Sequence, residues 1–365
     1  MPILSAKSES ITLWSFFRAF MFWGIPLVLF FLPTSPLSAQ TPDPSLRLIT
    51  SPLPISLTTE PGKTITTELK VKNGGTQEES LSIDLMKFRA YEDSGKPELL
   101  ERTPEDTFLT WVTFSEPTFT LAPDEWKTIT ATFTIPEEAA LSYYYTIVFS
   151  RTQDTQVLAP KQTAVIGGTA ILVLLEVSVP GAIREVNVTH FSVEKRFSEF
   201  LPTTFRITLE NTGNVHSAPR GNIFIDQGET KDIAILEVNS EKGNILPAST
   251  RLFTTEWTDG FPIYRNQQTK EGTTILDENN QPQRELHWDW NNTSKLRFGK
   301  YQATLLLIYD DGLRDVPITG TLTFWVVPWR MVLGVVFVLV FFLIGIRSTI
   351  RDMWYKIFKK SHTTV

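Results

Sequence analysis

The chain has 365 residues, of which 42% are hydrophobic and 20% charged, so it is long enough for two or three folded domains. It contains no cysteine, which excludes disulfides, thiolate metal sites and a cysteine nucleophile. The formal net charge is −6, and the segment between the two hydrophobic ends is more acidic than the whole chain, which argues against nucleic acid as a partner. Because secreted eukaryotic proteins of this size usually carry disulfides, an exported chain without cysteine is more typical of bacteria.

A signal peptide is predicted over residues 1–39. Arg18 precedes an apolar run over 19–32, and a polar stretch that ends in a small residue, Ala39, follows it. This order is typical of a secretory signal peptide that is cleaved near Ala39. An uncleaved N-terminal anchor is the alternative, although the apolar run is short for a membrane span.

Between residues 40 and 325 the sequence predicts strands throughout. Apolar and polar residues alternate with period two, which favours antiparallel strands with one buried face, and no long stretch has helical periodicity. The run 171–179 begins apolar on both faces and is expected to be a central strand. The other clear strands are expected at 69–72, 81–85, 129–135, 143–149, 205–209 and 301–307.

A weak internal repeat divides this region in two. The sequence LKVKNGG at 69–75 matches ITLENTG at 207–213, and a Leu-Ala-Pro step at 121–123 matches Leu-Pro at 246–247. The repeat predicts an all-β fold of two tandem immunoglobulin-like β-sandwich domains, which is followed by a single C-terminal transmembrane helix. The expected domains are residues 45–180 and 182–325, with polar insertions near 92–106 and 259–294.

The string from His287 to Trp290 is the most unusual candidate for a ligand contact. Trp288 and Trp290 are two residues apart, so on a strand they would share one face and could stack on the sugar rings of a wall ligand. The alternative is that they pack under the long insertion as a small satellite core. Tyr144, the middle of three consecutive tyrosines, is expected to be exposed and is the third candidate contact.

No catalytic or cofactor-binding pattern is recognisable. The four histidines are scattered without a HExxH motif or paired spacing, and neither GxSxG nor a phosphate-binding loop is present. The protein is therefore expected to be no enzyme and to hold neither metal nor cofactor. A glycan hydrolase with two carboxylates is an alternative, because acidic residues are many. The sequence 310–312, Asp-Asp-Gly, is expected to be a hairpin turn rather than a calcium site.

A transmembrane helix is predicted over residues 326–346, where an uninterrupted apolar run follows Met331. Trp325 and Trp329 are expected to lie in the outer membrane interface, and Arg330 is expected to reach the lipid head groups. A buried core helix is the alternative.

The tail over residues 347–365 is basic and contains Arg347 and Arg351, so the positive-inside rule places it in the cytoplasm. It is expected either to lie on the inner membrane surface or to be unstructured. The signal segment also starts in the cytoplasm, so the residues between it and the transmembrane helix are expected to be extracellular. The protein would then be a single-pass protein of the cell membrane.

The chain contains several turn and core motifs in a characteristic order: Ser-Pro-Leu at 51–53, Glu-Pro-Gly at 60–62, Asn73, Leu-Ala-Pro at 121–123, Ile-Pro at 135–136, three tyrosines at 143–145, the segment 211–216 and Pro-Arg-Gly at 219–221. These motifs resemble those of the bacterial WxL-associated surface proteins. The resemblance implies a peptidoglycan-binding domain, a second host-binding domain and a C-terminal membrane helix. The tyrosine motif of that family usually has glycine before the aromatic residues, where this chain has Ser142.

The sequence therefore predicts a non-catalytic, membrane-anchored surface protein whose partners are the lipid bilayer and either peptidoglycan or another envelope protein. A structural or assembly protein that pairs with a partner through edge strands is the closest alternative. Exposed tryptophans beside a groove would favour glycan binding, a long uncharged edge strand would favour strand pairing, and two carboxylates across a cleft would favour hydrolysis.

Overall fold

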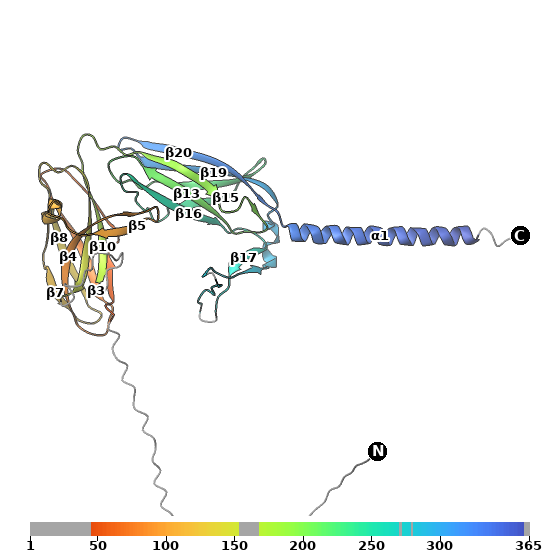
Figure 1. Cartoon of the computed structure of the whole chain (residues 1–365), viewed down its shortest axis with the longest axis horizontal. Helices are drawn as coiled ribbons and strands as arrows, with labels where there is room; N and C mark the ends of the chain where they lie inside the picture. Colours follow the sequence, from red (N-terminus) through yellow and green to blue (C-terminus); the bar gives the residue numbers. More distant parts are fainter. Residues whose placement is uncertain (1–44, 153–167, 270–271, 279, 361–365) are drawn as a thin grey trace, which may run out of the picture. The chain divides into compact units, whose positions relative to one another are not determined.

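The computed structural model describes residues 45–152, 168–269, 272–278 and 280–360, with side chains to Trp354. The fold class is confirmed: the strands form two immunoglobulin-like β-sandwiches, and one helix follows them (Figure 1). The signal peptide predicted over residues 1–39 lies outside the described residues.

The first sandwich consists of one sheet with the order β1-β3-β8-β6 and a second with the order β2-β10-β9-β4-β5, in which β7 also pairs with β4. A short 3-10 helix, η1 (Thr107–Trp111), precedes β6. The strands are β1 (Leu48–Ser51), β2 (Ile55–Thr59), β3 (Thr64–Asn73), β4 (Glu79–Tyr91), β5 (Lys96–Leu100), β6 (Val112–Phe114), β7 (Thr118–Leu121), β8 (Trp126–Thr134), β9 (Leu141–Arg151) and β10 (Gly168–Val177).

The second sandwich consists of a sheet β11-β13-β16 and a sheet β12-β20-β19-β14-β15, with a separate hairpin of β17 and β18. A second 3-10 helix, η2 (Trp290–Lys295), follows the hairpin. The strands are β11 (Val186–Val193), β12 (Phe197–Ser198), β13 (Thr203–Asn211), β14 (Arg220–Gln227), β15 (Thr230–Val238), β16 (Ser249–Trp257), β17 (Ile263–Asn266), β18 (Arg284–His287), β19 (Gly299–Asp310) and β20 (Asp315–Val326).

Alternation along the strands builds a core in each sandwich. In β8, Ile129, Ala131 and Phe133 are fully buried between threonines that are not. Removing such a side chain from water stabilises the fold by roughly 1.5–3 kcal/mol for a residue of the size of Phe. As predicted, β10 is central: it lies between β2 and β9, and residues 173–177 are buried on both faces.

In each sandwich the first stretch of chain crosses from one sheet to the other. β1 pairs with β3 antiparallel, and β2 then pairs with β10 in parallel. β11 and β12 repeat this arrangement with β13 and β20. Pro52 and Pro54 separate β1 from β2, and because proline has no N–H to donate, the ladder with β3 ends before them, at Ser51.

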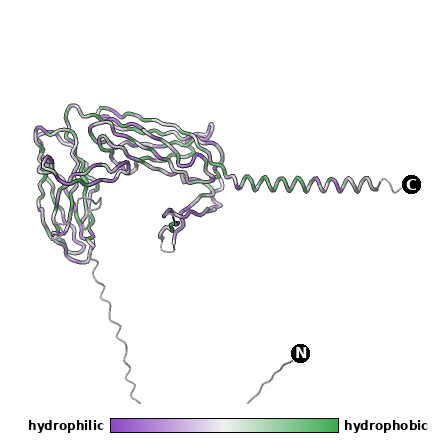
Figure 2. The backbone as a smooth tube through the Cα atoms, viewed as in Figure 1, coloured by the Kyte–Doolittle hydropathy of each residue, from purple (hydrophilic) through white to green (hydrophobic). Residues whose placement is uncertain are grey.

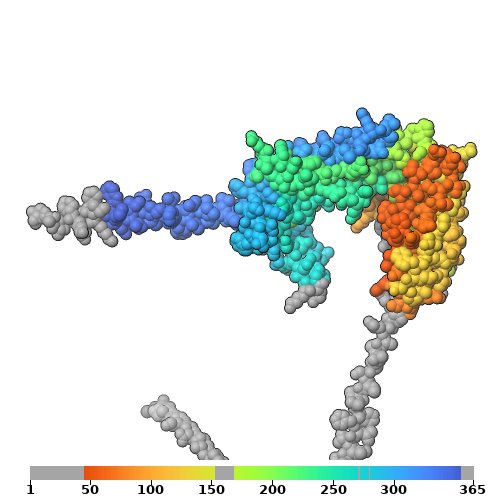
Figure 3. All heavy atoms as spheres, turned by 180° about the vertical axis from the view of Figure 1, so that it is seen from behind, coloured from red at the N-terminus to blue at the C-terminus, as the bar shows by residue number. Residues whose placement is uncertain are grey.

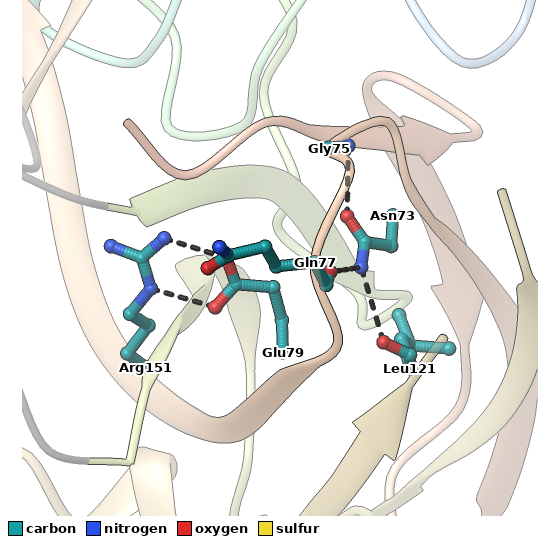
Figure 4. Close-up of polar contacts among 6 residues, drawn as sticks. All are labelled: Asn73, Gly75, Gln77, Glu79, Leu121 and Arg151. Carbon is teal, nitrogen blue, oxygen red and sulfur yellow. Dashed lines mark hydrogen bonds and ion pairs between the residues drawn. The ribbon is translucent and has the colours of Figure 1, made fainter. Parts of the chain in front are cut away.

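The first copy of the internal repeat contains Asn73, which is buried at the end of β3. Its amide nitrogen donates to the carbonyl oxygens of Gln77 (2.7 Å) and Leu121 (3.1 Å), and its oxygen accepts from the Gly75 N–H at 2.9 Å (Figure 4). Figure 4 also shows the ion pair of Arg151 with Glu79, at 2.6 Å and 2.7 Å, which joins the end of β9 to the start of β4.

Helix α1 (Trp329–Lys360) differs from the predicted span at both ends. It begins at Trp329 because Val326 is still paired with Gly299 in the sheet, and the Val332 N–H bonds to the carbonyl of Pro328 at 3.0 Å. It continues through the basic segment instead of ending at Ile346. No proline occurs there to stop it.

Among the described residues, α1 alone is long and apolar enough to cross a membrane. The candidate span is Trp329–Trp354, 26 residues, and none of its most apolar window is buried. At 1.5 Å per residue this length is about 39 Å, which exceeds the ~30 Å of a hydrocarbon core. Figure 2 shows the apolar residues along the first part of α1 and more polar residues toward its end.

Candidate functional site

The candidate site is built on the insertion that follows β16. β17 and β18 form its hairpin, with Ile263 opposite His287. The hairpin is held to the sandwich by a hydrogen bond from the Tyr264 N–H to the Leu201 carbonyl (2.8 Å), and within the insertion the Phe261 N–H donates to the Lys295 carbonyl at the end of η2 (3.0 Å). Figure 3 shows the atoms of residues 284–298, in light blue, at the surface of the second sandwich.

Phe261, Trp288 and Trp290 form what we call the aromatic cluster. The two indoles stack with ring centroids 5.5 Å apart and an angle of 24°. Phe261 packs against Trp288 at 5.7 Å and against Trp290 at 5.5 Å. Phe261 is 6% exposed, Trp288 40% and Trp290 69%, so the phenyl ring is the floor of the cluster and the indoles keep open surface.

The two tryptophans do not share a strand face, contrary to the prediction. β18 ends at His287, and the carboxylate of Asp289 accepts hydrogen bonds from the Asn291 N–H (3.2 Å) and the Asn292 side chain (2.6 Å). Asp289 thereby caps η2, which starts at Trp290. A turn, not a strand, brings the indoles together. The satellite core expected as an alternative is present, but it leaves the indoles partly exposed.

A polar pocket of about 150 Å³ borders the cluster. Asp259, Arg265, His287, Asn292 and Lys295 contribute to its lining, together with Phe261. Because ligand pockets for whole small molecules are usually ~300–1,000 Å³, this one suits a few polar groups of a larger ligand.

Asp259 is a carboxylate of the pocket that two basic side chains hold in place. It forms ion pairs with Lys295 at 2.6 Å and with Arg297 at 2.7 Å. Burial raises the pKa of Asp259, but the hydrogen bonds from Lys295 and Arg297 outweigh it and hold the pKa below its ordinary value. A general acid of a glycosidase needs a raised pKa, so this carboxyl is suited to hydrogen bonding and not to protonating a leaving group.

Tyr144 is not on an open surface, contrary to the expectation for this residue. Its ring lies 5.7 Å from that of Phe88 and 6.0 Å from that of His216, and its hydroxyl is buried without a hydrogen-bond partner in the protein. Burial raises the pKa of the hydroxyl. The neighbours Tyr143 and Tyr145 both pack against Phe108.

Of the residues expected at the membrane, Trp325 lies in β20, and Trp329, Arg330, Arg347 and Arg351 lie on α1. Trp329 is half exposed, and the Arg330 guanidinium lies 5.2 Å over its ring and 3.6 Å from a Glu199 oxygen. Arg347 and Arg351 are exposed on α1.

Trp325 stacks on Phe197, a residue that sequence reasoning missed. Phe261 was missed as well. Nothing in the sequence signals either phenylalanine, because each meets its partners across distant segments.

Among the described residues, no group of three or more His, Asp or Glu side chains could hold a metal ion. Residues 310–312 form the predicted hairpin turn between β19 and β20. The Asp310 carboxylate accepts from the Gly312 N–H at 2.8 Å, and that of Asp311 accepts from the N–H groups of Leu313 and Arg314, also at 2.8 Å.

No family model and no curated protein matches the chain. Among solved structures, the class 5 fimbriae chaperone CfaA is similar, with 12% identity, a TM-score of 0.34, and coverage of 75% of this chain and 98% of that one. The CsuC-CsuE chaperone-tip adhesion subunit pre-assembly complex of Acinetobacter baumannii matches with 11% identity, a TM-score of 0.32, and coverage of 75% and 97%. PapD-like domain 7 of human CEP192 matches with 15% identity, a TM-score of 0.25, and coverage of 40% and 94%. At these values the likeness identifies no function for this chain.

Proposed function

We propose that the protein is a non-catalytic, membrane-anchored cell-surface protein that binds cell-wall glycan through Trp288 and Trp290. Helix α1 anchors it in the cell membrane, with the two sandwiches outside and the basic end of the chain in the cytoplasm. The charge pattern supports this orientation, because Arg347 and Arg351 follow the apolar part of the span.

The observation that carries the proposal is the open indole surface beside a polar pocket. Trp290 is 69% exposed, and its other side is covered by Trp288. A sugar ring has an apolar face and a rim of hydroxyl groups. The apolar face suits an exposed indole, while the hydroxyl groups suit neighbouring side chains such as His287 and Asn292.

The cluster is also ordered before any ligand arrives. Phe261 is buried beneath both indoles, and the Asp289 cap defines the backbone that leads into Trp290. A preorganised aromatic surface loses little conformational entropy on binding. The ion pairs of Asp259 with Lys295 and Arg297 likewise fix side chains of the adjoining pocket before a ligand binds.

Sedimentation of the full-length protein with insoluble peptidoglycan tests the proposal. Wild-type protein is expected in the pellet, and Trp290→Ala is expected to bind about tenfold more weakly, which corresponds to ~1.4 kcal/mol. Trp126→Ala is the matched control, because Trp126 is an exposed tryptophan (51%) of the first sandwich. Wild-type protein that stays in the supernatant would contradict glycan binding.

A second candidate function, pairing with a partner strand, is favoured by the edge of β20. On its outer side β20 pairs only through Trp325 and Val326, with β12. Along residues 316–324 the described part of the chain pairs no further strand with β20 on that side, although β11 packs beside it through Phe191, and residues 316–324 carry no charge. A long uncharged edge is a template for an added strand.

Photo-crosslinking on intact cells tests this second function. A crosslinker at Thr321 is expected to capture one defined partner, and Thr319→Lys is expected to abolish that product because a charge at the edge opposes strand addition. A crosslinker at Thr128, which is exposed on the interior strand β8, is the control. The same products at both positions would contradict pairing along β20.

A further inference from the structure

Phe197 and Trp325 form a stacked pair on the surface of the second sandwich. Their ring centroids are 6.3 Å apart and the rings are nearly parallel, at 10°. Phe197 is 72% exposed and Trp325 is 39% exposed, so the pair presents a broad apolar surface to its surroundings. Such exposure of two large aromatic residues on paired strands marks an interaction surface.

The backbone holds this pair firmly. Phe197 lies in β12, which pairs in parallel with the end of β20. The Trp325 N–H donates to the Arg196 carbonyl and the Val327 N–H donates to the Ser198 carbonyl, both at 2.8 Å. The stack is therefore part of the sheet and not a mobile loop tip.

The chain also ties the pair to the start of α1. β20 ends at Val326 and α1 begins at Trp329, so only Val327 and Pro328 lie between them. With consecutive Cα atoms 3.8 Å apart, the Cα atoms of Trp325 and Trp329 are separated by no more than about 15 Å. A helix that enters a bilayer at Trp329 must therefore hold the stack close to the membrane surface.

The chemistry around the stack fits the interface of a bilayer. Tryptophan is enriched at the level of the head groups, where an apolar ring and a polar N–H are both satisfied. Lys195 and Arg196 are exposed immediately before Phe197, and Arg330 follows Trp329. Basic side chains at this depth attract anionic lipid head groups.

We propose that Phe197 and Trp325 insert into the head-group region of the outer leaflet. The second sandwich then lies against the membrane surface and is not joined to it only through Val327 and Pro328. This inference rests on the proposed anchoring by α1. Arg196 supplies the electrostatic attraction, and the Phe197–Trp325 stack supplies the apolar insertion.

Because the chain has no cysteine, single cysteines report on single positions. The full-length chain with Lys195→Cys, labelled with a polarity-sensitive fluorophore, keeps the stack intact. In nanodiscs of phosphatidylcholine and phosphatidylglycerol, its emission is expected to shift to the blue and to be quenched by lipids that carry a quencher near the head group. Adding Phe197→Asp is expected to reduce the quenching several-fold. Trp126→Cys, labelled in the same way, is the control and is expected to show neither effect.

A probe at Val335→Cys within α1, read with lipids that carry a quencher on the acyl chain because this residue lies about 9 Å along the helix from Trp329, separates the possible failures. Quenching at 335 without any at 195 would show that α1 spans the bilayer while the stack does not dock, and would overturn the inference alone. No quenching at either position would overturn the proposed anchoring and the inference together. Shielding at 195 that appears only when soluble wall fragments are added would assign the stack to glycan and would also overturn it.

Discussion

Asn73 and Asn211 occupy the same position in the two sandwiches. Both are fully buried. Asn211 repeats the bonds of Asn73: its amide nitrogen donates to the carbonyls of Val215 and Ile245, both at 2.8 Å, and its oxygen accepts from the Gly213 N–H at 2.9 Å. In each sandwich, one carboxamide thus satisfies main-chain groups of a tight loop and of a segment far along the sequence.

Replacing either asparagine by alanine is expected to destabilise its own sandwich by about 2–4 kcal/mol, because two buried carbonyl oxygens lose their donor. Thermal unfolding of the full-length protein followed by circular dichroism measures the effect. Asn187→Ala is the control, because Asn187 is exposed and its side chain donates to the Thr212 hydroxyl at 3.1 Å. An effect of Asn211→Ala no larger than that of the control would contradict the structural role.

The two glycines whose N–H groups donate to these asparagine oxygens are expected to differ in their tolerance of a side chain. A Cβ at Gly213 would lie 2.2 Å from the Ile183 carbonyl oxygen, whereas a Cβ at Gly75 would meet only the Asn73 side chain, at 3.1 Å. Gly213→Ala is therefore expected to cost about 1–3 kcal/mol through overpacking, and Gly75→Ala clearly less. Denaturant titration of both variants compares them. Equal losses would show that the clash at Gly213 is relieved by movement of the backbone.

His216 is expected to make the protein less stable as the pH falls below the ordinary histidine pKa of ~6.5. Burial lowers the pKa of His216, with Arg184 contributing in the same direction and Glu176 opposing, and its Nδ1 has no partner in the protein. The unfolded chain, with a histidine pKa of ~6.5, then binds a proton that the folded state does not. Stability is therefore expected to fall as the pH drops through 6.5 toward the lower folded pKa.

Melting temperatures of the wild type and of His216→Gln above and below pH ~6.5 test the dependence. The variant is expected to have the flatter profile, because glutamine does not titrate. Parallel profiles for the two proteins would assign the pH dependence to other groups.

Alanine substitutions in the aromatic cluster are expected to distinguish the ring that stabilises the insertion, Phe261, from the ring that is proposed to bind glycan, Trp290. Phe261→Ala removes the buried floor and is expected to destabilise the insertion by about 3 kcal/mol, whereas Trp290→Ala should change stability by less than about 1 kcal/mol, because its indole is 69% exposed. Hydrogen exchange of the β17–β18 amides reports on the first effect. Faster exchange in Trp290→Ala than in Phe261→Ala would reverse the assigned roles of the two rings.

Much of the fold could be predicted because its signals are local. The alternation at 129–135 and 301–307 corresponds to β8 and β19, and the apolar run at 171–179 corresponds to the central β10. The turn residues 310–312 also act locally, through bonds to adjacent N–H groups.

The candidate site was only partly predictable. Trp288 and Trp290 were recognised from their spacing, but a strand was expected where Asp289 starts a 3-10 helix. Tyr144 was expected at the surface, but its ring is covered by His216. Alternation along β9 shows only that the ring points away from the core, and it does not show what packs against the ring from outside. Both differences arise from contacts that follow only when distant segments come together.

By itself the sequence determined the clear strands, the repeated Asn-x-Gly turns and the apolar helix, because hydrophobic periodicity and turn chemistry act over a few neighbouring residues. The tertiary structure alone decided that Phe261 lies beneath Trp288 and Trp290, and that Phe197 meets Trp325. Those contacts join residues from separate strands and loops. Which side chains meet is set by strand register and sheet packing, and no local pattern in the chain records it.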